Sequence, residues 1–193
     1  MNNENLTAGE AVAQEPEPDI KKAQNGGWKE FLWGVAKDLI PTAIIVLLLF
    51  KVIFNITIVS GNSMVPTLHD GDILLLSHAF YEPDYGDIIV FQQPDEGVNY
   101  VKRVIGMPGD IIEISRTESV VYRNGEALEE DYISDKFFGP VEMDGPVTVE
   151  EGHYFVLGDN RFDSRDSRFN SVGQVSEDQI VGGYLFRVFQ AKH

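Results

Sequence analysis

The sequence predicts a mostly β fold that one N-terminal transmembrane helix anchors in a membrane. Two observations lead to this fold class. Residues 39–50 form an apolar run without a charged residue, near the start of the 193-residue chain. After residue 58, short alternating or apolar runs recur between clusters of Gly, Pro, Asn and Asp, a pattern typical of strands and turns. No helical periodicity of convincing length follows residue 58.

The N-terminal part divides into a tail and an anchor. Residues 1–27 are polar and punctuated by Pro and Gly, and we expect a disordered cytoplasmic tail, because they bury too little apolar surface to offset the entropy of ordering. Residues 28–58 are expected to form an aromatic interfacial segment and the transmembrane anchor, with Pro41 in a first helical turn. A cleaved signal sequence and a core helix are the alternatives for so short a run, although no small-residue cleavage site follows it.

The distribution of basic residues predicts the orientation of the anchor. Four lysines precede the apolar run: Lys21, Lys22, Lys29 and Lys37. After Lys51, which can extend its amine to the interface, the next basic residue is Lys102. Because positive charge stays on the cytoplasmic side, we expect a single-pass plasma-membrane protein with a cytoplasmic N-terminus and an extracytoplasmic domain of residues 59–193.

Composition excludes several classes of function. The formal net charge is −16, and residues 52–193 alone carry 24 acids against 10 bases, which argues against a nucleic-acid partner. The chain has no cysteine, so disulfides, thiolate metal sites and a cysteine nucleophile are excluded. The four histidines show no metal-ligand spacing, and we expect neither a metal nor a cofactor.

Seven segments are predicted strands of the β domain: 72–77, 87–91, 100–105, 110–114, 120–122, 154–157 and 180–188. Asn124-Gly125 is the strongest local signal, because an Asn-Gly pair favours a two-residue hairpin turn between two strands.

Three segments carry candidate chemistry: residues 60–68, 100–110 and 158–168. The first is not the Gly-x-Ser-x-Gly elbow of α/β-hydrolases, since Val65 replaces the second glycine. Lys102 lies within an otherwise apolar strand, where burial would lower its pKa and make it a competent base for a serine hydroxyl. From spacing alone, a solvated Lys-Arg pair on a strand edge and an ordinary turn serine remain open.

These segments, together with residues 86–91, resemble the signature boxes of type I signal peptidases, membrane-bound serine proteases that cleave signal peptides from exported proteins. The resemblance covers residues 54–181 and is closest to the short, single-anchor members of the family. It implies a signal-peptidase-like β fold and a serine endopeptidase with a Ser-Lys dyad and no cofactor. The implied partners are signal peptides of exported preproteins, the lipid bilayer and the protein-export machinery.

The resemblance also implies roles for single residues. Ser63 resembles the nucleophile, Lys102 the general base and Ser164 the hydroxyl that orients the lysine amine. Asp166 and Arg168 resemble the ion pair that braces the site, with a surface salt bridge as the alternative. The Ser63 N–H is expected to be one oxyanion donor, whereas the second donor stays open.

Family members bind small residues at the first and third positions before the cut, in an extended conformation and in shallow apolar pockets. The candidates for lining these pockets, with plain core packing as the alternative, are Val59, Met64, Leu68, Tyr100 and Val101. Phe80 and Tyr81 are candidates for dipping into the bilayer.

Two features depart from the family pattern. Only 47 residues separate Asp110 from Gly158, so we expect the insert around 111–157 to be a small β ribbon. Residues 169–175 replace the aromatic and glycine pattern usual after the last box.

The alternative functions are a specialised processing peptidase of the same family and a non-catalytic, membrane-tethered binding module. Self-cleaving repressors share the Ser-Lys β fold but lack an anchor and carry a DNA-binding head.

Overall fold

The computed structural model describes residues 27–192 except for residues 95 and 134–136. The chain divides into two units, Met1–Val46 and Leu47–His193. The tail predicted over residues 1–27 lies outside the described residues except for Gly27, where the first helix begins.

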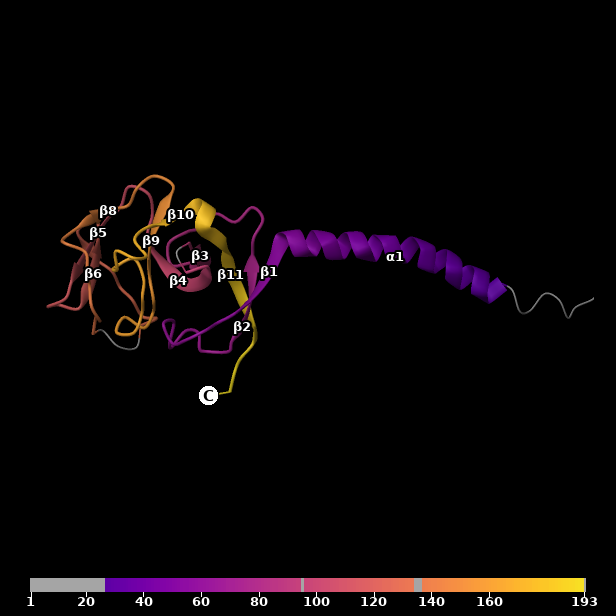
Figure 1. The fold of residues 1–193 in the computed structure, drawn as a ribbon, viewed down its shortest axis with the longest axis horizontal. Coiled ribbons are helices and arrows are strands. Elements are labelled where there is room, and N and C mark those ends of the chain that lie inside the picture. Colours follow the sequence, from indigo (N-terminus) through magenta and orange to yellow (C-terminus); the bar gives the residue numbers. More distant parts are fainter. Residues whose placement is uncertain (1–26, 95, 134–136, 193) are drawn as a thin grey trace, which may run out of the picture. The chain divides into compact units, whose positions relative to one another are not determined.

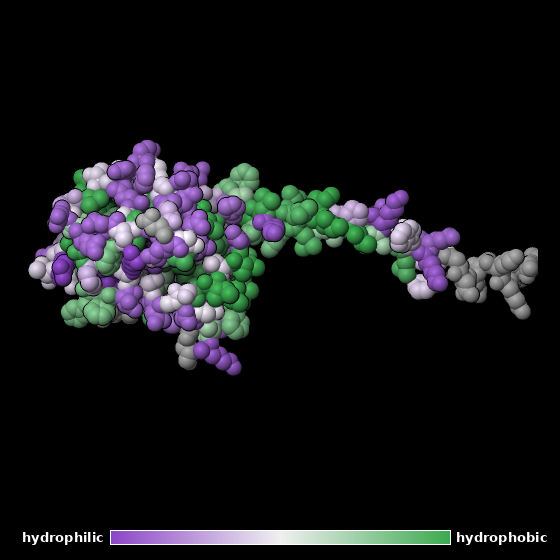
Figure 2. All heavy atoms as spheres, viewed as in Figure 1, coloured by the Kyte–Doolittle hydropathy of each residue, from purple (hydrophilic) through white to green (hydrophobic). Residues whose placement is uncertain are grey.

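Helix α1 spans Gly27–Ile53 and has no buried residue. Its apolar side chains are exposed along residues 39–50, and Figure 2 shows them as a continuous apolar segment. Within the part of the chain that the structure describes, no helix has the length and apolar character needed to cross a membrane. Pro41 lies inside the helix and not in its first turn as predicted, because the helix begins well before the apolar run.

The helix gives way to a strand earlier than the predicted anchor boundary at residue 58. Strand β1 (Phe54–Ile58) pairs antiparallel with β2 (Ile73–Ser77) in a register that joins Phe54 to Ser77. The β-branched residues of β1 favour a pleated conformation. The end of the expected anchor segment is therefore the edge strand of the β domain (Figure 1).

A seven-stranded antiparallel sheet forms the body of this domain, in the order β1-β2-β11-β3-β4-β9-β10. Its other strands are β3 (Ile88–Gln93), β4 (Val98–Gly106), β9 (His153–Leu157), β10 (Val175–Ser176) and β11 (Ile180–Phe189). A short 3-10 helix (Glu177–Gln179) precedes β11.

The insert forms a second antiparallel sheet in the order β7-β6-β5-β8. Its strands are β5 (Ile111–Ser115), β6 (Val120–Arg123), β7 (Glu126–Ala127) and β8 (Val147–Thr148). Asn124 and Gly125 connect β6 to β7 with φ of 54° and 81°, as a type I′ turn requires. The structure thus confirms the hairpin and all seven predicted strands, and adds β1 and three two-residue strands.

The core lies on both faces of β3, the central strand. Ile88 and Val90 belong to one apolar cluster, whereas Ile89 and Phe91 belong to another on the opposite face. A third cluster packs β9 against the insert. All six residues of β3 pair with residues 98–103 of β4, and this pairing holds β4 beside the core.

Candidate active site

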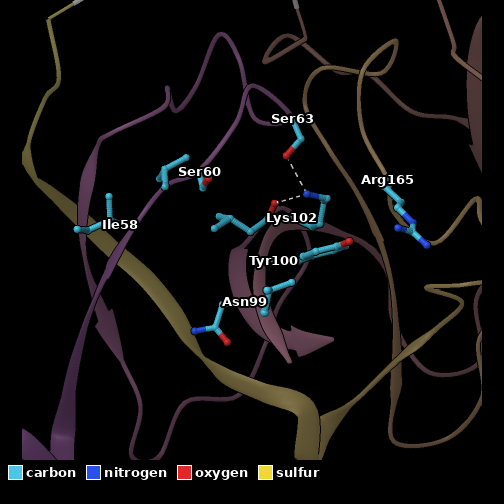
Figure 3. Close-up of a pocket in the computed structure, with 10 residues that line it drawn as sticks. Ile58, Ser60, Ser63, Asn99, Tyr100, Lys102 and Arg165 are labelled. Atoms are coloured by element: carbon cyan, nitrogen blue, oxygen red, sulfur yellow. Dashed lines mark hydrogen bonds between the residues drawn. The ribbon is translucent and has the colours of Figure 1, made fainter. Parts of the chain in front are cut away.

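Strand β4 carries Lys102 into the interior of the β domain. Lys102 pairs with Ile89 of β3, and only 4% of its surface is exposed. Its Nζ donates to Ser63 Oγ at 2.8 Å and to the Val101 carbonyl at 2.8 Å. Figure 3 shows the serine and lysine side chains pointing toward each other. The structure thus brings the predicted nucleophile and base within hydrogen-bonding distance.

Burial makes the ammonium of Lys102 a stronger acid than that of a solvated lysine. Removal from water lowers the pKa of its ammonium from 10.5 to about 8. Asp166 and Asp159 oppose this change by raising the pKa of Lys102, while Arg168 lowers it further. At pH 7 about a tenth of Lys102 is therefore a neutral amine, the form that can accept a proton from a hydroxyl, and this fraction rises to half at a pH of about 8.

Ser63 lies in the turn between β1 and β2. Its carbonyl accepts from the Asn160 N–H at 3.0 Å, which ties this turn to the loop that follows β9. Within the described residues its own N–H has no hydrogen-bond acceptor. That N–H is thus free to donate to a negatively charged oxygen beside Ser63 Oγ.

The loop after β9 holds the remaining predicted residues. Arg168 donates to both carboxylate oxygens of Asp166, at 2.7 and 2.8 Å, and both side chains are 0% exposed. The pair is therefore buried, and the surface salt bridge alternative does not apply. Ser164 Oγ donates to Asp166 at 2.7 Å, and no hydrogen bond joins the described side chains of Ser164 and Lys102.

Gly158 starts this loop at a point of close approach. A Cβ at this position would overlap Ser164 Oγ and the Ser63 carbonyl oxygen. The Gly158 N–H also donates to Asp166 at 2.9 Å. Glycine is required here because the loop passes directly against the serine turn.

A cavity of about 360 Å³ opens beside the two candidate catalytic residues (Figure 3). Of the five predicted pocket residues, Val59, Tyr100 and Val101 line it. Met64 and Leu68 do not: they belong to the same apolar cluster as Val59 and Val101 but are almost completely buried, at 0% and 1% exposed. Of the two predicted bilayer contacts, Phe80 is fully exposed, whereas Tyr81 packs against the second cluster.

No group of three or more metal-ligating side chains is present among the described residues. The reactive groups in the cavity lining are the hydroxyl of Ser63 and the amine of Lys102, and the guanidinium of Arg165 also lines it.

Comparison with known proteins identifies the family. The model of the family described as "Signal peptidase, peptidase S26" matches residues 32–189. The chain belongs to this family. It is a serine protease of the signal peptidase I class.

Several relatives match over most of their length. Signal peptidase I of Bacillus amyloliquefaciens is 36% identical over 183 residues, covering 90% of this chain and 91% of the relative. Signal peptidase I T of Bacillus subtilis is 37% identical, covering 81% and 84%. A crystal structure of a signal peptidase I from Enterococcus faecalis is 34% identical, covers 54% of this chain and 98% of its own, and gives a TM-score of 0.46.

Two further ion pairs support the site in this family member. Arg103, next to the lysine, donates to Asp159 at 2.6 and 2.8 Å. Arg161 is fully buried and donates to both oxygens of Glu130 at 2.6 and 2.7 Å. Sequence reasoning overlooked Glu130, because it lies in the insert and no local pattern links it to the loop. Arg103 and Arg161 lie within the boxes and could have been found there.

Proposed function

We propose that this chain removes N-terminal signal peptides from exported preproteins with a Ser63/Lys102 dyad. The observation that carries the proposal is the 2.8 Å contact between Ser63 Oγ and a buried lysine amine. A serine is a weak nucleophile unless a neighbouring base takes its proton. A lysine with a pKa of about 8 supplies that base without a histidine.

The proposed reaction has two stages. Neutral Lys102 takes the proton of Ser63 as Oγ attacks the scissile carbonyl, and the peptide bond breaks when the lysine returns that proton to the leaving amine. Water then attacks the resulting ester, and Lys102 accepts its proton and passes it to the departing Ser63 oxygen. The Ser63 N–H stabilises the oxyanion in both stages.

An edge of β4 supports binding of an extended substrate. Strand β9 pairs only with Arg103, Val104 and Gly106, so the stretch 98–102 has one edge that no described strand covers. A signal peptide can add to this edge through backbone hydrogen bonds. Its small side chains would then face the apolar wall of the cavity at Val59 and Val101. Ser164, Asp166 and Arg168 are proposed to hold the loop after β9 in place where Gly158 passes the Ser63 turn.

We also propose that α1 holds the chain at the plasma membrane, with its N-terminus in the cytoplasm and the β domain outside. The exposed apolar side chains of residues 39–50 support this, because such a surface is unfavourable in water. Flotation of the full chain with phospholipid vesicles tests the association. A chain that stays at the bottom of the gradient would contradict it.

Cleavage of a preprotein by the full chain in detergent tests the proposed chemistry. Ser63→Ala and Lys102→Ala should each abolish cleavage while circular dichroism shows an unchanged fold. Lys192→Ala is the matched control, since this lysine is exposed near the C-terminus. Retained cleavage in either dyad variant would refute the mechanism. A panel of unrelated signal peptides distinguishes a general signal peptidase from a specialised processing peptidase, which would cleave only one of them.

A further inference from the structure

A second charged group lines the cavity of the candidate active site. Arg165 lies between Ser164 and Asp166 in the loop after β9, and its side chain is 51% exposed. It lines the same cavity as Ser63 and Lys102. Figure 3 shows its side chain beyond Tyr100, across the cavity from Ile58 and Ser60. The dyad mechanism does not use this arginine.

Contacts behind the cavity hold Arg165 in place. Its Nη1 donates to Glu96 at 2.6 Å, and its Nε donates to Ser171 Oγ at 3.2 Å. The second oxygen of Glu96 accepts from the Tyr100 hydroxyl at 2.8 Å. The guanidinium is thus fixed by a carboxylate that Tyr100 fixes in turn.

The two charges of this pair are not equivalent toward the cavity. Arg165 is part of the cavity lining, whereas Glu96 is not. Both oxygens of Glu96 are already hydrogen-bonded, while the contacts of Arg165 with Glu96 and Ser171 use its Nη1 and Nε and leave its Nη2 group out. A bound molecule therefore meets a cation with spare donors before it meets the anion.

Alternation along the β4 edge determines which substrate side chain would reach Arg165. Val101 faces the apolar cluster that contains Val59, while Tyr100 and Lys102 face the other way, with Lys102 Nζ 5.2 Å from the centre of the Tyr100 ring. A strand added to this edge alternates in the same manner. If the first and third side chains before the cut face Val59 and Val101, the second faces Tyr100 and Arg165.

We propose that Arg165 is a specificity-determining residue that favours an acidic over a basic side chain at the second position before the scissile bond. This inference rests on the proposed function. The guanidinium would donate to a substrate carboxylate and repel a substrate ammonium. Because Arg165 is half-exposed and already paired, the expected preference for Glu over Lys is only about fivefold in kcat/KM, and it falls as salt screens the interaction.

Three preproteins that differ only in Ala, Glu or Lys at this position test the proposal with the full chain in detergent. The wild type should prefer Glu to Lys at low salt. Arg165→Met should bring the ratio of the two kcat/KM values close to one, and Arg165→Lys should keep its direction. Arg116→Met is the matched control for loss of one positive charge, because Arg116 is exposed on the insert, and it should leave the ratio unchanged.

The outcomes separate this inference from the proposed function. Cleavage of the Ala preprotein together with equal rates for Glu and Lys would overturn the specificity role and leave the peptidase intact. An unchanged ratio in Arg165→Met would also overturn it. Failure to cleave all three preproteins would refute the proposed function and this inference with it. Should Arg165→Met fold poorly, the wild-type ratio, its salt dependence and Arg165→Lys still decide.

Discussion

Replacing Lys102 by methionine should remove a pH-dependent part of the stability of the protein. The pKa of Lys102 is about 8 in the folded state, against 10.5 when the lysine is solvated. Between these values the unfolded chain binds more protons, so the free energy of unfolding rises with pH, by about 3 kcal/mol in total. Below pH 8 the lysine is charged in both states, and the folded state carries the full penalty of burying an ammonium.

Methionine fills a similar volume without a charge. The variant should therefore show no such rise between pH 8 and 10.5. At neutral pH it should be more stable than the wild type by about 1–2 kcal/mol, because the relieved burial penalty exceeds the loss of two hydrogen bonds worth about 1 kcal/mol each. Cleavage activity should be absent. Function is thus expected to be maintained at the expense of stability.

Urea unfolding of the full chain in detergent, repeated across this pH range, measures the effect. Lys192→Met is the control, because it removes an exposed lysine and should follow the wild-type curve. The difference between the two variants cancels the titration of tyrosines, which both retain. If Lys102→Met kept the wild-type rise, or were several kcal/mol less stable at neutral pH, the assignment of a buried, easily deprotonated lysine would be wrong.

Three further predictions concern the site and its support. The kcat/KM of wild-type cleavage should rise about tenfold per pH unit below a midpoint near 8, because Lys102 loses its proton. A profile of kcat/KM that is flat from pH 6 to 9 would contradict this. Gly158→Ala should lower the free energy of unfolding in urea by about 1–3 kcal/mol and remove much of the cleavage activity, because the new methyl group overlaps Ser164 Oγ. Glu130→Gln removes the ion-pair partner of the buried Arg161 and should cost about 3 kcal/mol in urea unfolding. The substitution Glu129→Gln at an exposed position should have little effect.

The strands could be predicted from sequence because their apolar patterns are local. The Asn124-Gly125 turn and the alternation in β4 and β5 depend on neighbouring residues only. The boundary between helix and sheet was harder to place. Residues 52–58 are apolar enough to extend the anchor, and only their pairing with β2, nearly twenty residues later, shows that β1 begins at Phe54. The two-residue strands β7, β8 and β10 are too short to leave a pattern.

The site residues, too, could be predicted where the signal is local and not where it depends on contacts distant in sequence. Ser63 and Lys102 could be assigned because the segments around them resemble family boxes, and the structure places their side chains in contact. Met64 and Leu68 could not be distinguished from pocket residues, since an apolar side chain beside a nucleophile suits both a pocket and a core. Glu130 was beyond reach for a different reason. Its partner Arg161 lies 31 residues away, across the insert, and a single sequence does not record that pairing.

The arrangement of charge explains why burial, and not the nearby carboxylates, dominates the pKa of Lys102. Asp159 and Asp166 both lie near enough to favour its charged form. Each carboxylate, however, is already paired with an arginine, Asp159 with Arg103 and Asp166 with Arg168. Paired carboxylates exert a weaker net field on the lysine, and Arg168 itself disfavours a second positive charge nearby. The arginines of the loop and of β4 thus limit how far the two carboxylates raise the pKa of Lys102.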